Sequence, residues 1–303
     1  MKILITGSTG LVGSALVRAL QEIGHTVCRL VRPGSSTEGT RVSGGFDVSW
    51  NPVTGELGGA AVGADAVVNL AGASIAEGRW TPERKSLLHS SRVDTTRALV
   101  GALSKMGARP GVLVSASAIG YYGSRGDETL TEASPPGQDF LGQIGQQWEA
   151  EAGKAEALGI RVVQARFGVI LSKHGGALPK MMRPIQWGVG GKIGSGRQWT
   201  SWIALEDVVA ILRFALENEK VRGPINVVSP QPARNGEFTK ELAKALRRPA
   251  FFPVPAFALR LLLGEMADAL LLSSQHVLPT QLERLGYRFV HPEIGSAFRS
   301  ILS

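Results

Sequence analysis

The chain of 303 residues contains one cysteine, Cys28, and only three tyrosines. One cysteine cannot form an internal disulfide, and its place in an apolar stretch predicts a thiol in a reducing, cytoplasmic protein. No apolar run reaches the roughly 18–20 residues that a membrane-spanning helix needs. The longest candidate, 259–272, is interrupted by charged residues and predicts a buried amphipathic helix. Because the chain begins on the apolar stretch MKILITG, we expect no secretory leader.

Basic residues are in excess, with a formal net charge of +8, but they form no block of five or six. This scatter argues against nucleic acid as a partner and fits the phosphate groups of small ligands. The five histidines lack metal-ligand spacing, so no metal is expected. The composition is that of a soluble globular protein, with no membrane partner and either a monomer or a homodimer expected.

A glycine-rich turn follows the first predicted strand. The strand KILIT is continuously apolar, as in the buried centre of a parallel sheet. Gly7, Gly10 and Gly13 follow at GxxGxxG spacing, before a helix with one apolar face and a second strand at 26–31. Such glycines allow a tight turn, a close pyrophosphate and close helix packing, and the helix N-terminus attracts phosphate. The pattern predicts a dinucleotide site, and we place Thr9, Leu11 and Val12 in it.

The second strand ends in basic residues. A unit specific for NAD usually carries Asp or Glu there, to bind the ribose 2′-hydroxyl. This chain has Arg32, with Arg29 nearby, and no acid. A guanidinium can hold a 2′-phosphate through two hydrogen bonds, so NADP(H) is predicted in preference to NAD(H), with Arg32 as the contact. The alternative is that both arginines face solvent.

Strands and helices alternate through the first part of the chain. This pattern predicts an α/β fold with a Rossmann-type doubly wound parallel sheet and a ligand at the carboxyl ends of its strands. We expect a Rossmann domain at 1–172 and a smaller substrate-facing α/β part with a C-terminal extension at 173–303, from which part of 203–230 returns to the sheet. Further cofactor contacts are predicted at strand ends and on the helix expected at 82–105: Leu70, Ala71, Gly72, Ser115 and Arg92.

Distinct motifs are spread along almost the whole chain, among them GSTGLVG at 7–13, NLAGASI at 69–75, SASAIGYYG at 115–123, RFGVILSKHGGAL at 166–178 and GEMADALLLSSQHVLP at 264–279. Together they resemble the extended or atypical short-chain dehydrogenases/reductases, within them the epimerase-like family with a characteristic C-terminal extension. The resemblance implies a Rossmann domain that binds NADP, with Arg166 and Gly168 among its cofactor contacts. Members are mostly described as nucleotide-sugar epimerases.

The catalytic residues usual in this superfamily are a Ser or Thr, a Tyr, and a Lys four residues after the Tyr. Ser117 matches the serine. The segment at 139–152, where the Tyr and Lys are expected, contains neither residue. A tyrosine with its ordinary pKa of about 10 is a poor acid–base catalyst at neutral pH without such a neighbouring ammonium. The standard dyad is therefore absent.

Two interpretations of the adjacent tyrosines Tyr121 and Tyr122 remain. In the first, one of them is the proton donor, beside Ser117 and a cation such as Lys180 or Arg166. The protein is then an NADP-dependent oxidoreductase or epimerase for a small polar substrate, with a nucleotide-linked molecule as the narrower option. In the second, the tyrosines are walls of a pocket, and the chain is a regulatory or interaction protein that binds NADPH without turnover.

The segment at 175–203 is rich in glycine and carries basic and amide side chains. The resemblance places a nucleotide-sugar pocket here, and the predicted substrate contacts are Lys180, Arg197, Gln198 and Trp202. The alternative is a flexible surface connector. Phe251, Phe252 and Phe257 are expected in the core.

Overall fold

The centre of the molecule is a sheet with the order β12-β8-β6-β5-β1-β2-β4-β3. The computed structural model describes residues 1–34, 41–42 and 45–303. Within these ranges every pair in the sheet is parallel except β3–β4. This confirms the predicted doubly wound Rossmann-type fold. The strands are β1 (Lys2–Thr6), β2 (Thr26–Val31), β3 (Arg41–Val42), β4 (Gly45–Ser49), β5 (Ala66–Asn69), β6 (Val112–Ala118), β8 (Arg161–Phe167) and β12 (Gly223–Val227).

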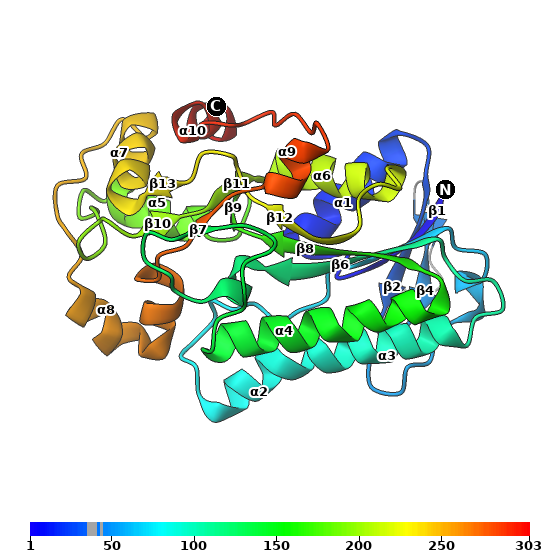
Figure 1. The fold of residues 1–303 in the computed structure, drawn as a ribbon. Helices are drawn as coiled ribbons and strands as arrows, with labels where there is room; N and C mark the ends of the chain where they lie inside the picture. Colours follow the sequence, from blue (N-terminus) through cyan, green and yellow to red (C-terminus); the bar gives the residue numbers. More distant parts are fainter. Residues whose placement is uncertain (35–40, 43–44) are drawn as a thin grey trace.

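Helices cover both faces of this sheet (Figure 1). Side chains alternate along β1, so Ile3 and Ile5 enter one core and Leu4 enters the other. All three side chains are fully buried, and burial of each such side chain contributes about 1.5–3 kcal/mol. The covering helices are α1 (Leu11–Glu22) and α6 (Leu205–Glu217) on the first face, and α3 (Val93–Ser104) and α4 (Phe140–Gly153) on the second.

The strand order reverses between β1 and β5. From β1 the chain moves outward through β2 and β4, whereas from β5 it moves through β6, β8 and β12 in the opposite direction. The last residues of the two strands, Thr6 and Asn69, are direct neighbours in the register. Doubly wound sheets bind their ligands at this kind of switch point, beyond the carboxyl ends of the strands.

A smaller α/β lobe is built from residues after β8, on the left in Figure 1. Trp202, Phe238 and Phe298 are buried in its core. The chain returns from this lobe to the main sheet at β12, which pairs with β8. The elements after β8 other than α6 and β12 are β9 (Val169–Leu171), α5 (Leu178–Gln186), β10 (Trp199–Thr200), β11 (Trp202–Ala204), β13 (Ala233–Arg234), α7 (Asn235–Ala245), α8 (Ala256–Leu263), the π-helix η4 (Ala267–Leu271), β14 (His276–Val277), α9 (Thr280–Arg284) and α10 (Ile294–Leu302).

Short elements connect the first strands and helices: η1 (Gly59–Ala61), α2 (Pro82–Ser90), η2 (Ile119–Tyr122), β7 (Thr129–Leu130) and η3 (Lys154–Leu158). Within the described ranges, no helix is both long and apolar enough to cross a membrane. The same ranges contain no group of three His, Cys, Asp or Glu residues arranged to hold a metal ion.

The apolar segment at 259–272 differs from its prediction. It is divided between α8, in which no residue is buried, and the π-helix that follows. Phe251, Phe252 and Phe257 were expected in the core, but they are 82%, 62% and 73% exposed. The physical reason is position: α8, which carries Phe257, lies at the outer edge of the lobe (Figure 1), and Phe251 and Phe252 lie in the segment that leads into it. An apolar helix is buried only where a neighbouring element covers it, and the helix's own sequence does not show whether one does.

Candidate cofactor and catalytic site

The glycine turn after β1 has the geometry that its spacing predicts. Gly7 has φ +64°, and a Cβ atom there would lie 2.5 Å from the Leu70 carbonyl oxygen. A Cβ on Gly13 would lie 2.2 Å from the Gly7 carbonyl oxygen, so α1 can pack this close only with glycine at position 13. A Cβ on Gly10 would meet only one atom, at 3.3 Å. Gly10 is exposed, so the space beside it is open to a ligand.

The first turn of α1 offers free backbone donors. Gly10 is its N-cap, and no side chain caps the helix there. Thr9 is exposed, while Leu11 and Val12 are half-buried. Such a helix end attracts anions through its unpaired N–H groups and its dipole. The residues present therefore fit the pyrophosphate of a dinucleotide.

A buried threonine joins this turn to the end of β5. The Thr6 hydroxyl accepts hydrogen bonds from the backbone N–H groups of Leu70 (3.0 Å) and Ala71 (3.2 Å), and donates one to Asn69 Oδ1 (2.7 Å). The Asn69 amide in turn donates to the Ser115 hydroxyl at 3.3 Å. Ser115, predicted as a cofactor contact, is 1% exposed and belongs to this supporting network. Sequence reasoning missed the part that Thr6 plays, because a lone threonine at a strand end carries no signal.

The two arginines of β2 and its end have different surroundings. Arg29 donates two hydrogen bonds to the buried carboxylate of Asp47, at 2.6 and 2.8 Å, so its charge is neutralised. Arg32 is exposed and makes no ion pair with any residue that the structure describes. Of the two, only Arg32 has a guanidinium that pairs with no carboxylate of the described residues.

Arg92 lies at the break between α2 and α3, where the sequence predicted a single helix. Its guanidinium donates to the Ala73 carbonyl at 2.9 Å and lies beside Gly72. Burial lowers the pKa of Arg92 to about 10, and the nearby charge of Arg84 adds to this effect. Arg92 is thus still a cation at neutral pH, and within the described ranges no carboxylate pairs with it. A partly buried cation of this kind favours an anionic ligand.

At the end of β6, the hydroxyl of the predicted catalytic serine is bound to a buried ion pair. The Ser117 hydroxyl donates to Glu149 Oε1 at 2.6 Å. Arg166 holds the same carboxylate through two hydrogen bonds of 2.7 Å each. Burial alone would lower the pKa of Arg166, but the Glu149 carboxylate outweighs this effect and raises it. Arg166, predicted as a cofactor contact, is 2% exposed and is directed at Glu149.

Tyr122 belongs to the same buried network. Its side chain is fully buried, and its hydroxyl donates to Asn226 Oδ1 (2.7 Å) and accepts from Arg166 (2.8 Å). Burial raises the pKa of Tyr122 to about 12, although the charge and hydrogen bond of Arg166 act in the opposite direction. The phenol therefore both donates and accepts a hydrogen bond within the protein.

Tyr121 has a different environment. Its ring lies against the Arg166 guanidinium, whose central carbon is 3.6 Å from the ring centroid. The side chain is half-buried, and its hydroxyl forms no hydrogen bond with the described part of the chain. A Cβ on Gly145, one turn before Glu149 on α4, would lie 3.2 Å from the Tyr121 Cβ. Glycine at 145 therefore makes room for Tyr121 on the helix where the standard dyad would lie.

The predicted substrate residues do not form one cluster. Trp202 is fully buried and donates to the Gln231 carbonyl at 3.0 Å. Gln198 is 9% exposed and its amide donates to two backbone carbonyls. Arg197 and Lys180 are exposed, and the Lys180 ammonium donates to the Ala76 carbonyl at 3.0 Å. Only these two have charged groups that a ligand can reach.

Gly168 has a packing role in the structure, because a Cβ there would lie 2.6 Å from the Ser201 carbonyl oxygen. Sequence reasoning missed Glu149 and Asn226, which complete the buried network. Their partners lie 17 to 104 positions away along the chain. Nothing in the spacing of the segment at 148–152, WEAEA, points to Arg166.

Comparison with known proteins identifies the family. A sequence model of the NAD-dependent epimerase/dehydratase family matches residues 3–228, and a domain of unknown function, DUF1731, matches residues 254–301. An epimerase family protein of Mycobacterium bovis is 42% identical over 298 residues, covering 97% of this chain and 95% of that protein. The chloroplastic SDR39U1 homologue of Arabidopsis thaliana is 40% identical over 304 residues, covering 100% of this chain and 87% of that protein.

Solved structures agree. Human epimerase family protein SDR39U1, crystallised with NADPH, is 34% identical, with a TM-score of 0.87 and 99% of each chain covered. A nucleoside-diphosphate sugar epimerase from Corynebacterium glutamicum is also 34% identical, with a TM-score of 0.79, covering 100% of this chain and 58% of that one. The chain therefore belongs to the NAD-dependent epimerase/dehydratase family, as an SDR39U1-like member of the epimerase-like extended short-chain dehydrogenases/reductases.

Proposed function

We propose that the protein is an NADP(H)-dependent oxidoreductase or epimerase in which Tyr121 is the proton donor. The observation that carries this proposal is the contrast between the two tyrosines. Tyr122 has its hydroxyl bound to Asn226 and Arg166, whereas the Tyr121 hydroxyl has no hydrogen-bond partner among the described residues. The Arg166 guanidinium also lies closer to the ring centroid of Tyr121 (3.6 Å) than to that of Tyr122 (5.0 Å), which it contacts through the hydroxyl hydrogen bond.

NADP(H) in preference to NAD(H) is part of the proposal. The open first turn of α1 fits the pyrophosphate, and Arg32 at the end of β2 is an exposed cation where NAD-specific proteins place an acid. The NADPH bound in the human SDR39U1 structure supports the same assignment. When bound, the nicotinamide would accept or supply a hydride.

The residues of the chain would handle the proton that accompanies this hydride. In reduction, the Tyr121 hydroxyl gives its proton to the substrate carbonyl oxygen; in oxidation, its phenolate takes the proton of the substrate hydroxyl. The Arg166 guanidinium lies against the Tyr121 ring, but it is bound to the Glu149 carboxylate, and no lysine stands where the standard dyad places one. We therefore expect slow turnover. Ser117 donates to Glu149 and would act by holding that carboxylate in place.

A small polar, nucleotide-linked substrate fits the proposal. The exposed cations Lys180 and Arg197 lie on the smaller lobe, which we propose faces the substrate. Similarity to the Corynebacterium nucleoside-diphosphate sugar epimerase supports the same class. The charges of Lys180 and Arg197 would pair with the phosphate groups of the substrate.

A second candidate is a protein that binds NADPH without turnover. It is favoured by one observation: α4 carries neither tyrosine nor lysine, and Ser117 is already bound to Glu149. A regulatory or interaction protein needs only the cofactor site, and the tyrosines would then be packing residues.

A substrate screen separates the two candidates. Nucleoside-diphosphate sugars and small carbonyl compounds are incubated with NADP⁺ or NADPH, and nicotinamide absorbance and sugar epimers are measured. With an active substrate, Tyr121→Phe should lower kcat about 10²–10⁴-fold, whereas Tyr122→Phe should retain most activity if it remains folded. Equal rates in wild type and Tyr121→Phe would remove Tyr121 from this role. If no substrate turns over while NADPH binds, the second candidate is supported.

A further inference from the structure

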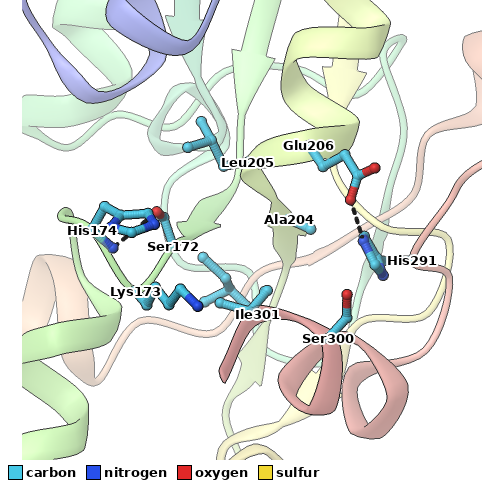
Figure 2. A pocket seen from close by; sticks show the side chains of 10 residues that line it. Ser172, Lys173, His174, Ala204, Leu205, Glu206, His291, Ser300 and Ile301 are labelled. Atoms are coloured by element: carbon cyan, nitrogen blue, oxygen red, sulfur yellow. Dashed lines mark hydrogen bonds and ion pairs between the residues drawn. The ribbon is translucent and has the colours of Figure 1, made fainter. Parts of the chain in front are cut away.

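A pocket of about 290 Å³ lies outside the cofactor and catalytic residues (Figure 2). It is formed where β9 and β11 end side by side, at Leu171 and Ala204, and where α6 begins. Its other walls come from residues 172–174, from His291 and from α10. None of the predicted cofactor or catalytic residues lines it. The pocket thus joins the segment that matches the epimerase family to the segment that matches DUF1731.

The pocket has one basic side. Lys173 and His174 lie together on the left of Figure 2, both exposed to solvent. The Lys173 ammonium donates one hydrogen bond, to the backbone oxygen of Ser303 at 2.7 Å, which leaves two of its three donor hydrogens. The turn that carries both residues is held by a hydrogen bond, which the buried Ser172 hydroxyl accepts from the His174 backbone N–H at 3.2 Å.

The opposite side carries an acceptor in a fixed position. On the right of Figure 2 the Glu206 carboxylate lies 2.8 Å from Nε2 of His291. The buried carboxylate of Asp207 accepts hydrogen bonds from the backbone N–H groups of Val290 (2.8 Å) and His291 (2.9 Å), which fixes the backbone that carries the imidazole. The Glu206 side chain is 66% exposed, so its oxygens also remain accessible to a ligand.

Apolar side chains of Leu205 and Ile301 lie between these two sides (Figure 2), and Leu171 also lines the pocket. We propose that the pocket binds a small organic carboxylate that carries a hydroxyl or amino group at its far end. The carboxylate would meet Lys173 and His174, the aliphatic middle would cover the apolar residues, and the far group would donate to Glu206. This proposal does not depend on the proposed oxidoreductase function.

The charges decide against a phosphate as the ligand. Glu206 and Asp207 already occupy the first turn of α6, which carries no free positive end for a dianion. A monoanion matches the basic side without approaching Glu206. The size agrees, since ligand pockets start at about 300 Å³ and this one therefore suits only a small molecule.

Calorimetry and NMR titration of the full chain test the proposal. The probes are 5-hydroxypentanoate and 5-aminopentanoate, with pentanoate and inorganic phosphate as comparisons. We expect saturable binding of the first two, at least tenfold tighter than that of either comparison. Lys173→Met and Glu206→Gln should each weaken it at least tenfold, while Lys220→Met, which removes an exposed lysine elsewhere, should not. NADPH affinity and thermal stability report that each variant is folded.

Absence of saturable binding by both probes, or tighter binding of phosphate, would overturn the proposal. So would binding that neither Lys173→Met nor Glu206→Gln changes in folded protein.

Discussion

The proposed cofactor site and the proposed catalytic site are built from different kinds of group. At the end of β1, the proposed cofactor site consists of backbone: Gly7 turns the chain, and no side chain caps the first N–H groups of α1. At the end of β6, polar side chains are abundant, but Ser117, Glu149 and Arg166 are bound to one another. The first region has backbone donors that no side chain caps, whereas the polar side chains of the second region form hydrogen bonds with one another.

This difference explains which role each region can fill. Backbone donors at a helix end stay available because few groups inside the protein can reach them. Buried side chains that lack a partner are costly, so they pair whenever the fold brings them together. Tyr121 stands apart in the second region, since its hydroxyl forms no hydrogen bond within the described residues.

The largest effect on stability is expected from breaking the buried pair of Arg166 and Glu149. Arg166→Met leaves the Glu149 carboxylate buried and unpaired, which should lower the free energy of unfolding by about 3–5 kcal/mol. Denaturant titration measures this loss. Replacing both partners, as Arg166→Met with Glu149→Leu, should restore much of the stability. A single variant as stable as wild type would show that the pair is not a buried charge pair in solution.

The proposed cofactor site should respond in the opposite way, with lost binding and retained stability. A side chain at Gly10 meets little of the protein but occupies the space of the pyrophosphate. Gly10→Val should therefore weaken NADPH binding by at least about 100-fold, or roughly 2.7 kcal/mol, with little change in melting temperature. Gly101→Val, in a helix where a Cβ meets nothing within 4 Å, is the matched control. NADPH fluorescence titration decides, and unchanged affinity in Gly10→Val would contradict the assignment.

Alkaline pH should reduce the stability that Tyr122 contributes. The folded pKa of Tyr122, about 12, lies above its ordinary value of 10.0, so the fold favours the protonated phenol. This stability is fully present below pH 10 and should be lost as pH rises towards 12, by about 2–3 kcal/mol in all. Unfolding measured between pH 9 and pH 12 should show a steeper decline in wild type than in Tyr122→Phe. Parallel curves would mean that Tyr122 ionises normally.

The smallest expected effect concerns the cofactor's 2′-phosphate. Arg32→Ala should weaken NADPH binding by about 1.5–3 kcal/mol, the range for a hydrogen bond to a charged group. NADH binding should change little, so the preference for NADPH should fall. Calorimetry with both nucleotides measures it, and Arg18→Ala, an exposed arginine on α1, is the control. An unchanged preference would leave Arg32 facing solvent.

Sequence reasoning succeeded where chemistry depends on local spacing. The glycine turn, α1 and the central strands follow from short-range patterns, and the doubly wound sheet follows from their alternation. It failed for α8 and for Phe251, Phe252 and Phe257, whose exposure depends on which elements lie next to them. It also left Tyr121 and Tyr122 equivalent, because their difference is set by Arg166 and Asn226, distant in the chain and adjacent in the fold.

The central claim is that Tyr121, and not Tyr122, faces the reacting atoms beside a bound NADP(H). A crystal structure of the complex with NADP⁺ tests it most directly. The account predicts that the Tyr121 hydroxyl faces the nicotinamide ring across the space for a substrate, while Tyr122 stays hydrogen-bonded to Asn226. A nicotinamide ring placed away from Tyr121, with another proton-donating side chain beside it, would contradict the account.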